Sequence, residues 1–551
     1  TVNALTQAVT GLANHTNYYY RVRAVGANGT SANSNVITVY TGENYRSKTN
    51  GNWNDVGTWE VSSDNNTWVD ASVVPAIGAA NISIGNGHLI TVTENASADL
   101  VTIQPTGKLT VNDGITLTSP VTLQSDATGT ATVMGAVTGT ATVNQAVTAP
   151  RTYYMGLPVS VSPEISGITG ISKFNIVTDT WSGIATQNTT FDTKGIGYLV
   201  QVAVGSTTNI SFKGTLNSGS IEAPFSTAKR RFNYYGNPYP SFLETNKVIT
   251  AAGSNIDPSI WFYSKGSVSY AFTTYNSTTK ETLPSTADGR VIPPMQGFWL
   301  RAKTGASATS FTFTNAMRLH KPTGSNAIFK APKAAASSKL NLTISNGTVA
   351  DETLVLFNEA AQTGFDVYDS EKMMNSAPSL NIFTVVGDQK LAMNGMPAVM
   401  YDTEIPLGVN VPAGTYTISA IRFANFAEGE KVQLIDKATN TLTDISATDY
   451  TFAVSEALNN TTRFVLVFPS KVGTSVNSTE MNISNVYVSD GRIVVNVTKP
   501  VQGNLIEVYN SVGQRIASQA ITGSSNRIEK QLNSGVYIVK VNAESTKVII
   551  K

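Results

Sequence analysis

The sequence predicts an all-β protein, built from tandem β-sandwich modules, a β-solenoid-like segment and a small C-terminal seven-stranded sandwich. Apolar and polar residues alternate over short runs rich in β-branched and aromatic side chains, such as residues 18–24 and 493–497. Glycine, proline and Asn-Gly or Asp-Gly pairs separate these runs, as expected of turns between strands. Helical periodicity is nearly absent, and only residues 369–375 are expected to form one or two helical turns.

Length and composition limit the number of domains and the classes of function. The chain has 551 residues, enough for about three to five domains at roughly 150 residues each. Its 38 basic and 37 acidic residues give a formal net charge of +1, which excludes a nucleic-acid binder that acts through a concentrated basic face. The absence of cysteine excludes disulfides and thiolate chemistry. No stretch reaches about 18 consecutive apolar residues, so no membrane-spanning helix is predicted.

Residues 1–42 have the pattern of the end of a domain. Tyr18 and Tyr20 stand in a run of alternating residues, and residues 36–39 form a second β-branched run. This pattern resembles the E–F corner and strands F and G of a fibronectin type III module, in which a tyrosine hydroxyl ties the corner to upstream backbone. A complete module needs about 90–100 residues, so the resemblance implies that the native polypeptide continues upstream of residue 1.

Residues 43–150 begin with three tryptophans, Trp53, Trp59 and Trp68. Short strands then recur about every 6–12 residues, a spacing typical of a β-solenoid. The sequence Gly-Thr-Ala-Thr-Val occurs at residues 129–133 and again at 139–143, an internal echo of this segment. The tryptophans are expected to cover the open end of the solenoid, because terminal repeats need a cap. The alternative is a sugar-stacking platform.

Composition sets the remaining boundaries. Residues 151–320 are predicted to form a β-sandwich or jelly-roll-like module, and residues 338–470 a further β-sandwich, with a linker at residues 321–337. Residues 471–480 contain few apolar side chains and are predicted to be a second linker. Residues 481–551 then form a compact terminal β domain.

The terminal domain has the clearest strand pattern in the chain. The pair Asp490-Gly491 predicts a tight hairpin turn between two strands. The last predicted strand reaches the final residue, although chain ends usually fray, and an ordered terminus suggests that a partner docks there. Four blocks of residues stand out for their order and spacing. They are Pro500 with Gly503, residues 508–510 with Gly513, residues 535–539, and residues 547–551.

These four blocks resemble a type A C-terminal sorting domain, which belongs to cargo of the type IX secretion system of Bacteroidota. The preceding residues 43–470 are similar to modules often found beside such domains, a resemblance that implies no activity. The resemblance assigns recognition to a set of residues in the last blocks. They are Pro500, Gly503, Gly513, Gly535, Tyr537, Lys547, Val548, Ile549, Ile550 and Lys551.

The resemblance also implies a route across the cell envelope. The domain would fold in the periplasm and address the chain to an outer-membrane translocon, where a β-barrel shuttle protein would receive it. A sorting cysteine endopeptidase would then cut within residues 471–485, and the cargo would be released or attached to surface lipopolysaccharide. The expected location is the cell surface or the medium. For Gly535 and Tyr537 a second interpretation, compatible with the first, is a turn glycine before a core tyrosine.

Few groups in the sequence suggest catalysis. The three histidines, His15, His88 and His320, lie in three different predicted domains, so they are not expected to share a metal site or a triad. No nucleophile elbow, phosphate-binding loop or HExxH motif is present. We therefore predict no enzyme activity, no cofactor and no metal centre.

Two further groups are candidate binding sites. Asp366, Asp369 and Glu371 offer carboxylate oxygens that suit a hard cation such as calcium; the alternative is a turn salt-bridged to Lys372. A group of aromatic residues offers rings for a carbohydrate groove; the alternative is the packed core of aromatic-rich turns. This group contains Tyr235, Tyr239, Trp261 and Trp299, with Tyr234 and Tyr263 beside them.

Together these observations favour the non-catalytic C-terminal region of a large secreted or cell-surface protein, with stalk and structural modules followed by an export and anchoring signal. One alternative is the accessory region of an exported hydrolase whose catalytic domain lies upstream of residue 1. Another is a carbohydrate-binding adhesin that uses the aromatic clusters of residues 151–320.

Overall fold

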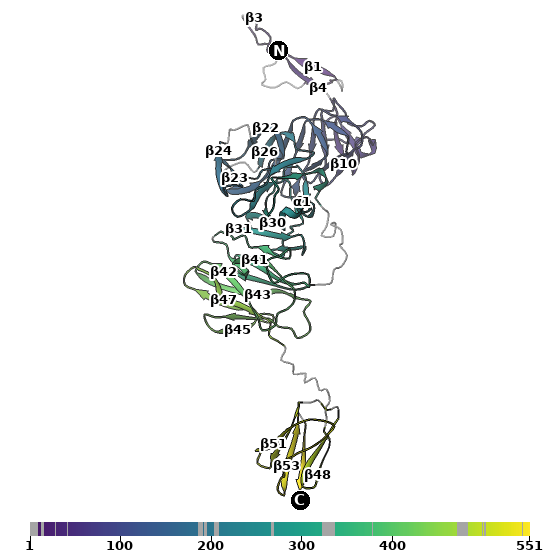
Figure 1. Ribbon diagram of the computed structural model, residues 1–551. Helices are drawn as coiled ribbons and strands as arrows, with labels where there is room; N and C mark the ends of the chain where they lie inside the picture. Colours follow the sequence, from purple (N-terminus) through teal and green to yellow (C-terminus); the bar gives the residue numbers. More distant parts are fainter. Residues whose placement is uncertain are drawn as a thin grey trace. The chain divides into compact units, whose positions relative to one another are not determined.

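The computed structural model describes residues 9–12, 16–27, 29–40, 42–185, 191, 195–202, 209–265, 269–321, 337–376, 378–470, 483–498, 500, 503–542 and 544–551. The chain divides into two units, Thr1–Pro469 and Ser470–Lys551. Strands dominate both units, which confirms the all-β prediction (Figure 1). Nearly all of the predicted linker 321–337, and the whole of 471–480, lies outside the described residues, as does the predicted cleavage region up to residue 482.

The described part of residues 9–40 contains two small antiparallel strand pairs. β1 (Asn17–Tyr20) pairs with β4 (Ile37–Tyr40), and β2 (Val25–Gly26) pairs with β3 (Gly29–Thr30). The β1–β4 pair falls where the sequence predicts strands F and G. Membership of the fibronectin type III family stays a prediction, since these short pairs are common to many β folds.

Residues 44–146 form a solenoid of three parallel ladders, which confirms the predicted solenoid-like segment. The first ladder contains β5 (Asn44–Ser47), β9 (Asn81–Ile84), β12 (Val101–Ile103), β15 (Val121–Leu123) and β20 (Ala141–Ala146). The second contains β6 (Gly51–Asn52), β10 (Leu89–Val92), β13 (Lys108–Val111) and β18 (Thr132–Met134). The third contains β11 (Ala96–Ser97), β14 (Thr116–Thr118) and β19 (Ala136–Thr138).

The length of one coil differs from the spacing of the sequence echo. Val101 pairs with Val121, and Val121 pairs with Ala141, so these coils are 20 residues apart, while the second ladder has a spacing of 24 residues between Lys108 and Thr132. The two copies of the echo, residues 129–133 and 139–143, lead into β18 of the second ladder and β20 of the first. The echo therefore repeats a strand pattern on different faces of the solenoid and does not mark its coils.

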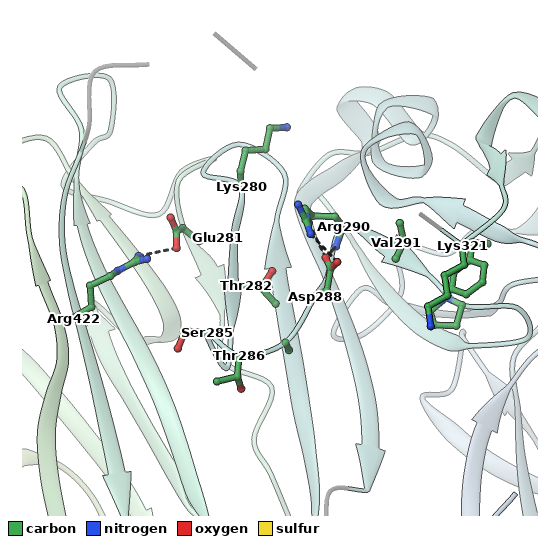
Figure 2. Close-up of a pocket in the computed structure, with 13 residues that line it drawn as sticks. Lys280, Glu281, Thr282, Ser285, Thr286, Asp288, Arg290, Val291, Lys321 and Arg422 are labelled. Carbon is green, nitrogen blue, oxygen red and sulfur yellow. Dashed lines mark hydrogen bonds and ion pairs between the residues drawn. The ribbon is translucent and has the colours of Figure 1, made fainter. Parts of the chain in front are cut away.

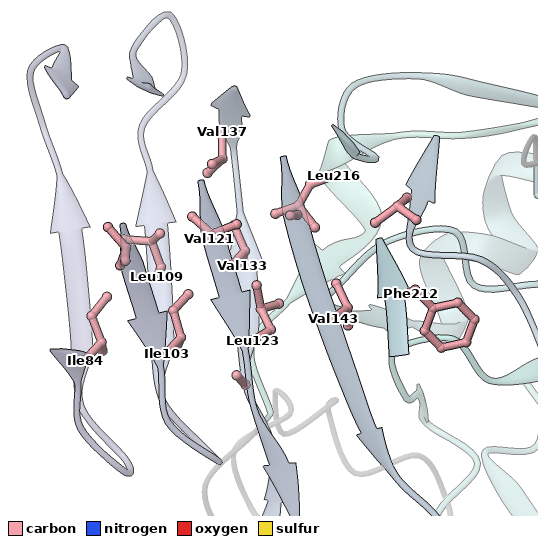
Figure 3. Packing of buried hydrophobic residues seen from close by; sticks show 14 of the residues in the cluster. Ile84, Ile103, Leu109, Val121, Leu123, Val133, Val137, Val143, Phe212 and Leu216 are labelled. Atoms are coloured by element: carbon pink, nitrogen blue, oxygen red, sulfur yellow. The ribbon is translucent and has the colours of Figure 1, made fainter. Parts of the chain in front are cut away.

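A row of buried side chains holds the coils together. Ile84, Ile103, Leu123 and Val143 are in register along the first ladder, and each is at most 1% exposed. Phe212 continues the row, because β26 (Asn209–Leu216) pairs with β20 and places Phe212 opposite Val143 (Figure 3). Burying one such side chain stabilises a fold by about 1.5–3 kcal/mol. The row therefore fixes β26 to the last coil.

Two of the three tryptophans pack at the beginning of the solenoid, where the sequence predicts a cap. Two further strands extend the first ladder beyond β5, namely β7 (Trp59–Ser62) and β8 (Val69–Asp70). Trp53 and Trp59 are buried, with ring centroids 5.3 Å apart in an edge-to-face contact. The indole of Trp53 donates a hydrogen bond to the carbonyl of Pro75 (3.1 Å), and that of Trp59 to the carbonyl of Trp53 (3.0 Å). Trp68 packs instead against the guanidinium of Arg46, 4.2 Å from its ring centroid.

The first ladder continues past residue 150, where the sequence predicts a boundary. β20 pairs with β26, and β26 pairs with β22 (Val159–Ser166), so the ladder becomes a nine-stranded sheet. The segment predicted as a module over residues 151–320 therefore shares a sheet with the solenoid.

The rest of residues 151–320 forms a four-stranded sheet, a five-stranded sheet and two smaller ones. The four-stranded sheet contains β21 (Arg151–Met155), β25 (Tyr198–Val202), β23 (Gly170–Asn175) and β24 (Thr180–Ile184). The five-stranded sheet contains β28 (Phe232–Gly236), β34 (Gly297–Ala302), β30 (Ile256–Lys265), β31 (Tyr270–Asn276) and β32 (Glu281–Leu283). The smaller sheets pair β27 (Ile221–Pro224) with β35 (Ser310–Phe313), and β29 (Phe242–Glu244) with β33 (Val291–Ile292) and β36 (Arg318–Leu319).

Helical structure differs from the prediction. The α-helix of the described residues, α1 (Thr245–Ala252), buries Val248, Ile249 and Ala252 in the core, an apolar face too short to give a periodic signal. Residues 369–375 form no helix, because β39 (Ser370–Glu371) pairs there with β41 (Gln389–Met396). In the part of the chain that the structure describes, three short 3-10 turns complete the helical elements: η1 (Val56–Thr58), η2 (Gly253–Asn255) and η3 (Asn315–Met317). Among the described residues, none of these helices has the length and hydropathy of a membrane span.

Residues 338–467 form one eleven-stranded sheet around an apolar core. In order, its strands are β45 (Thr441–Asp444), β44 (Gln433–Asp436), β47 (Leu458–Val467), β42 (Glu404–Val411), β40 (Asn381–Val386), β41 (Gln389–Met396), β38 (Ala350–Phe357), β37 (Ser338–Ser345), β43 (Gly414–Ala424) and β46 (Tyr450–Val454). β39 pairs with β41 beside this path.

The second unit is a seven-stranded sandwich in its described part, as predicted. One sheet contains β48 (Ile483–Ser489), β49 (Arg492–Val497) and β52 (Ser525–Arg527). The other contains β51 (Arg515–Ala520), β50 (Leu505–Asn510), β53 (Gly535–Val541) and β54 (Glu544–Ile550). Asp490 and Gly491 join β48 to β49 with φ angles of 50° and 70°, the conformation that a two-residue hairpin turn requires.

Candidate functional site

The last two strands of the chain form a hairpin that is apolar on both of its faces. β53 and β54 pair antiparallel, with Val536 opposite Ile549 and Ile538 opposite Lys547. Tyr537, Val539 and Val548 point into the sandwich core, as alternation along a strand requires. Their neighbours point away from that core and are exposed: Val536 by 38%, Ile538 by 41% and Ile549 by 55%. We call Val536, Ile538, Lys547 and Ile549 the hairpin face.

Most of the other residues that the resemblance singled out serve the fold. Tyr537 is 8% exposed, and its hydroxyl donates a hydrogen bond to the carbonyl of Asn533 (2.8 Å). Gly503 and Gly513 have φ angles of 96° and 80°, a region that side chains rarely adopt, so glycine is needed at both turns. Gly535 begins β53 just before Tyr537. The interpretation as turn glycine and core tyrosine thus fits the geometry, and Val548 and Ile550 are also core residues.

The hairpin face lies beside the edge strand of its sheet. β54 is the outer strand of its sheet, and within the described residues it pairs with β53 alone. β48 of the other sheet packs beside β54 without pairing with it, and an edge strand of this kind is a place where a partner strand can add. Lys547 and Lys551 are exposed and place positive charge beside the apolar side chains. Val536 and Ile538 are not among the predicted recognition residues, although the apolar run 536–539 in β53 is the signal of a strand with two apolar faces.

The comparisons with known proteins agree with this geometry. Residues 489–551 match the family model described as Secretion system C-terminal sorting domain. The chain therefore carries a type IX sorting domain, and it is exported across the outer membrane to the cell surface or the medium. Residues 44–468 match the model described as Domain of unknown function (DUF8693), and the chain belongs to that family. No curated protein and no solved structure matches the chain.

The predicted cation site is not assembled. Asp366 accepts hydrogen bonds from the backbone of Gln362 and Tyr368, at 2.7 Å each. Asp369 accepts hydrogen bonds from the backbone of Asp366 (2.7 Å) and of Gly395 (2.8 Å), and burial raises its pKa to about 7. Within the described residues, no group of three or more acidic or histidine side chains is placed to hold a metal ion.

The alternative interpretation of this segment is a turn salt-bridged to Lys372, and the structure gives Lys372 a different partner. Lys372 does not pair with the carboxylates of this turn; its ammonium pairs with Asp351 at 2.5 Å. Glu371 pairs instead with the buried guanidinium of Arg301, where Nη1 lies 2.6 Å from Oε2. Burial raises the pKa of Glu371, and the charge of Arg301 opposes the shift. The ion pairs of Glu371 and Lys372 therefore connect β39 and the residue after it to Arg301 and to Asp351.

The aromatic groove predicted from the sequence is largely core. Tyr235, Tyr239 and Trp261 are at most 1% exposed, so a sugar ring cannot stack on them. Their polar atoms are bonded internally: the Tyr235 hydroxyl to the carbonyl of Pro224 (3.0 Å), and the Trp261 indole to that of Glu371 (3.0 Å). Burial raises the pKa of the Tyr239 hydroxyl. Trp299 is 6% exposed and reaches a pocket described next.

A pocket of about 530 Å³ lies where residues 154–301 meet residues 371–390. We call it the aromatic pocket. Its rings come from Tyr154, Phe174, Trp181, Tyr263, Phe272 and Trp299. The sequence analysis missed Tyr154 and Trp181, because single aromatic residues on separate strands give no local signal of a shared pocket.

A second, larger pocket of about 760 Å³ is lined mainly by charged and hydroxyl side chains (Figure 2). Its charges pair with one another. Glu281 binds Arg422 at 2.7 Å and Lys339 at 2.6 Å, and Asp288 binds Arg290 at 2.8 Å. Burial alone would raise the pKa of Glu281, but the hydrogen bonds from the two cations outweigh it and lower the pKa. Glu281 thus joins β32 to β37 and β43.

The two histidines that the structure describes, His88 and His320, contact different partners. His15 lies outside the described residues. His88 Nδ1 lies 2.8 Å from the hydroxyl of Ser47. His320 lies near the end of the predicted 151–320 module, yet it packs on the solenoid between the hydroxyls of Thr110 (2.9 Å) and Thr132 (2.7 Å).

Proposed function

We propose that this chain is the non-catalytic C-terminal region of a large exported protein. In this proposal the DUF8693 region is a structural β module, and the sorting domain is the folded signal that a β-barrel shuttle protein and the type IX translocon recognise. A sorting cysteine endopeptidase then cuts within residues 471–485, and the cargo is released or attached to surface lipopolysaccharide.

The hairpin face is the observation that carries the proposal. A monomeric sandwich gains nothing from exposing Val536, Ile538 and Ile549 on adjacent positions of two paired strands. β54 is also the edge strand of its sheet, with β48 packed beside it. A partner that packs on the hairpin face would remove these apolar side chains from water.

The non-catalytic assignment is supported by the hydrogen-bond partners of acidic and histidine side chains, which are the groups that a catalytic site would use. Asp366 and Asp369 accept backbone hydrogen bonds, and His88 and His320 bind hydroxyls of neighbouring strands. Asp366 and Asp369 thus serve turn formation, and His320 is held between two threonines of the solenoid. An accessory region of an exported hydrolase would look the same in residues 1–551, and an assay of the native exported protein for hydrolase activity distinguishes the two.

The experiment compares the full chain with a truncation of residues 547–551 and with Ile549→Lys. Each is expressed in a cell with type IX secretion, and outer membranes are used for a pull-down with intact-mass readout. We expect the truncation to abolish export and capture of the shuttle protein. Ile549→Lys should weaken both at least tenfold, because a charge replaces an apolar contact.

The matched control is Val512→Lys, which changes another exposed apolar side chain of the same unit, 83% exposed, in the turn between β50 and β51. This variant should be exported like the unchanged chain. Normal export and capture of Ile549→Lys would show that the machinery does not read the hairpin face.

A further inference from the structure

We propose that the aromatic pocket binds a neutral sugar residue of a polysaccharide. The pocket volume of about 530 Å³ falls within the range of small-molecule sites. The proposal does not depend on the sorting domain, so its failure would leave the export proposal unchanged.

Trp181 provides an apolar surface inside the pocket. Its side chain is 36% exposed, although tryptophan is usually buried. Phe174 and Tyr234 hold the ring by contacts at centroid distances of 5.1 and 5.3 Å, and Tyr154 by an edge contact at 5.9 Å. The ring is therefore fixed in place before any ligand arrives, which lowers the entropic cost of binding. An aromatic surface of this kind packs against the C–H face of a pyranose ring.

Arg301 supplies a polar group that the fold leaves incompletely bonded. Its side chain is 8% exposed, and Nη1 pairs with Glu371 (2.6 Å) and Asp257 (3.3 Å). Its Nε has no hydrogen-bond partner among the residues that the structure describes. A buried donor without a partner is costly and uncommon in folded proteins. The Nε atom itself is enclosed, so the polar groups that a ligand in the pocket can reach belong to the other lining side chains.

The charges around the pocket select the class of ligand. Arg230, Arg301, Lys372 and Lys390 disfavour a cation, even though aromatic rings alone would attract one. Three of these cations are already neutralised by carboxylates, namely those of Asp179, Glu371 and Asp351. An anion therefore meets little free positive charge. A purely apolar ligand would bury charged groups without replacing their hydrogen bonds.

A neutral sugar satisfies these conditions together. Its hydroxyls both donate and accept hydrogen bonds, as a site with guanidinium, carboxylate and amide groups requires. Glu371, Asp388 and Gln389 line the pocket as acceptors, and Arg230 and Lys390 as donors. The C–H face of the same ring covers the indole of Trp181.

The test uses the full chain and four oligosaccharides: cellotetraose, mannotetraose and xylotetraose as neutral probes, and trigalacturonic acid as an anionic one. Binding is measured by tryptophan fluorescence and calorimetry. We expect at least one neutral probe to bind with a Kd below 1 mM and trigalacturonic acid to bind at least tenfold more weakly. Failure of every neutral probe at 10 mM, or preference for trigalacturonic acid, would overturn the proposal.

Three variants locate the binding. Trp181→Ala should weaken it at least tenfold, Trp181→Phe should retain most of it, and Trp68→Ala should leave it unchanged, because Trp68 lies on the solenoid. Gln389→Ala tests the polar side of the pocket independently, with an expected loss of about fivefold. Thermal melting of each variant checks its folding. Binding that survives both Trp181→Ala and Gln389→Ala would place the ligand elsewhere and contradict the assignment.

Discussion

The indole nitrogen of Trp261 donates a hydrogen bond of 3.0 Å to the backbone carbonyl of Glu371, and so joins β30 to β39. The same junction contains Asn276, whose side-chain amide donates to the carbonyls of Val367 (3.2 Å) and Asp369 (3.0 Å). Asn276 and Asp369 are buried, so the bond between them is shielded from water and helps to fix the two segments to each other. The two regions predicted as separate sandwiches therefore meet through specific polar contacts.

Removing the side chain of Asn276 should weaken this junction. Asn276→Ala leaves the buried carbonyl of Asp369 without its donor, which costs about 1–3 kcal/mol of unfolding free energy. Urea denaturation followed by tryptophan fluorescence measures the loss. Asn459→Ala, an exposed position in β47, is the control and should change stability by less than about 0.5 kcal/mol. Equal midpoints for the two variants would show that the junction contributes no stability.

The solenoid cap gives a second prediction. Trp53→Ala removes a buried ring that contacts Trp59, and truncations of this kind cost about 3–5 kcal/mol. Trp68→Ala removes a half-buried ring with one cation–π contact, which is worth about 0.5–1 kcal/mol at an exposed site. Hydrogen exchange should therefore accelerate over β5 to β9 in the first variant and little in the second. Similar protection in both would mean that Trp53 does not cap the coils.

Local signals in the sequence predicted the features that depend on neighbouring residues. The Asp490-Gly491 pair predicted a hairpin, because its backbone conformation is a property of the dipeptide. Evenly spaced β-branched runs predicted the solenoid, because each coil repeats the same inward positions. In the sorting domain the motif spacing located the strands, yet the outward positions of Val536 and Ile538 became apparent only with the register of β53 and β54.

Features that depend on distant segments could not be predicted in this way. The sheet that continues across residue 150 depends on the pairing of β20 with β26, which begins at Asn209. A run of aromatic residues is compatible with both a groove and a core. Trp261 is buried because residues 367–371, which are distant in the sequence, pack against it. The aromatic pocket needs Tyr154, Trp181 and Trp299 from three strands, so no continuous motif encodes it.

The environment of His320 gives a prediction about pH. Burial lowers the pKa of His320 from its ordinary value of 6.5 to about 4, and the charges of Lys108 and Arg318 act in the same direction. Between pH 6.5 and 4 the unfolded chain binds a proton that the folded chain does not, so the free energy of unfolding falls as the pH falls through this range. The shift corresponds to about 3 kcal/mol in total, and the loss levels off below pH 4.

The variant His320→Gln isolates this contribution. Glutamine keeps hydrogen-bonding groups for Thr110 and Thr132 but has no proton to gain, so the variant should lose less stability than the unchanged chain between pH 6.5 and 4. Asp369 acts in the opposite direction, because its pKa is raised by burial to about 7 and its protonation stabilises the fold as the pH falls. That contribution is common to both proteins and cancels in their difference. Urea midpoints at pH 7, 5.5 and 4 measure the two slopes, and identical slopes would mean that His320 is as easily protonated in the folded chain as in the unfolded one.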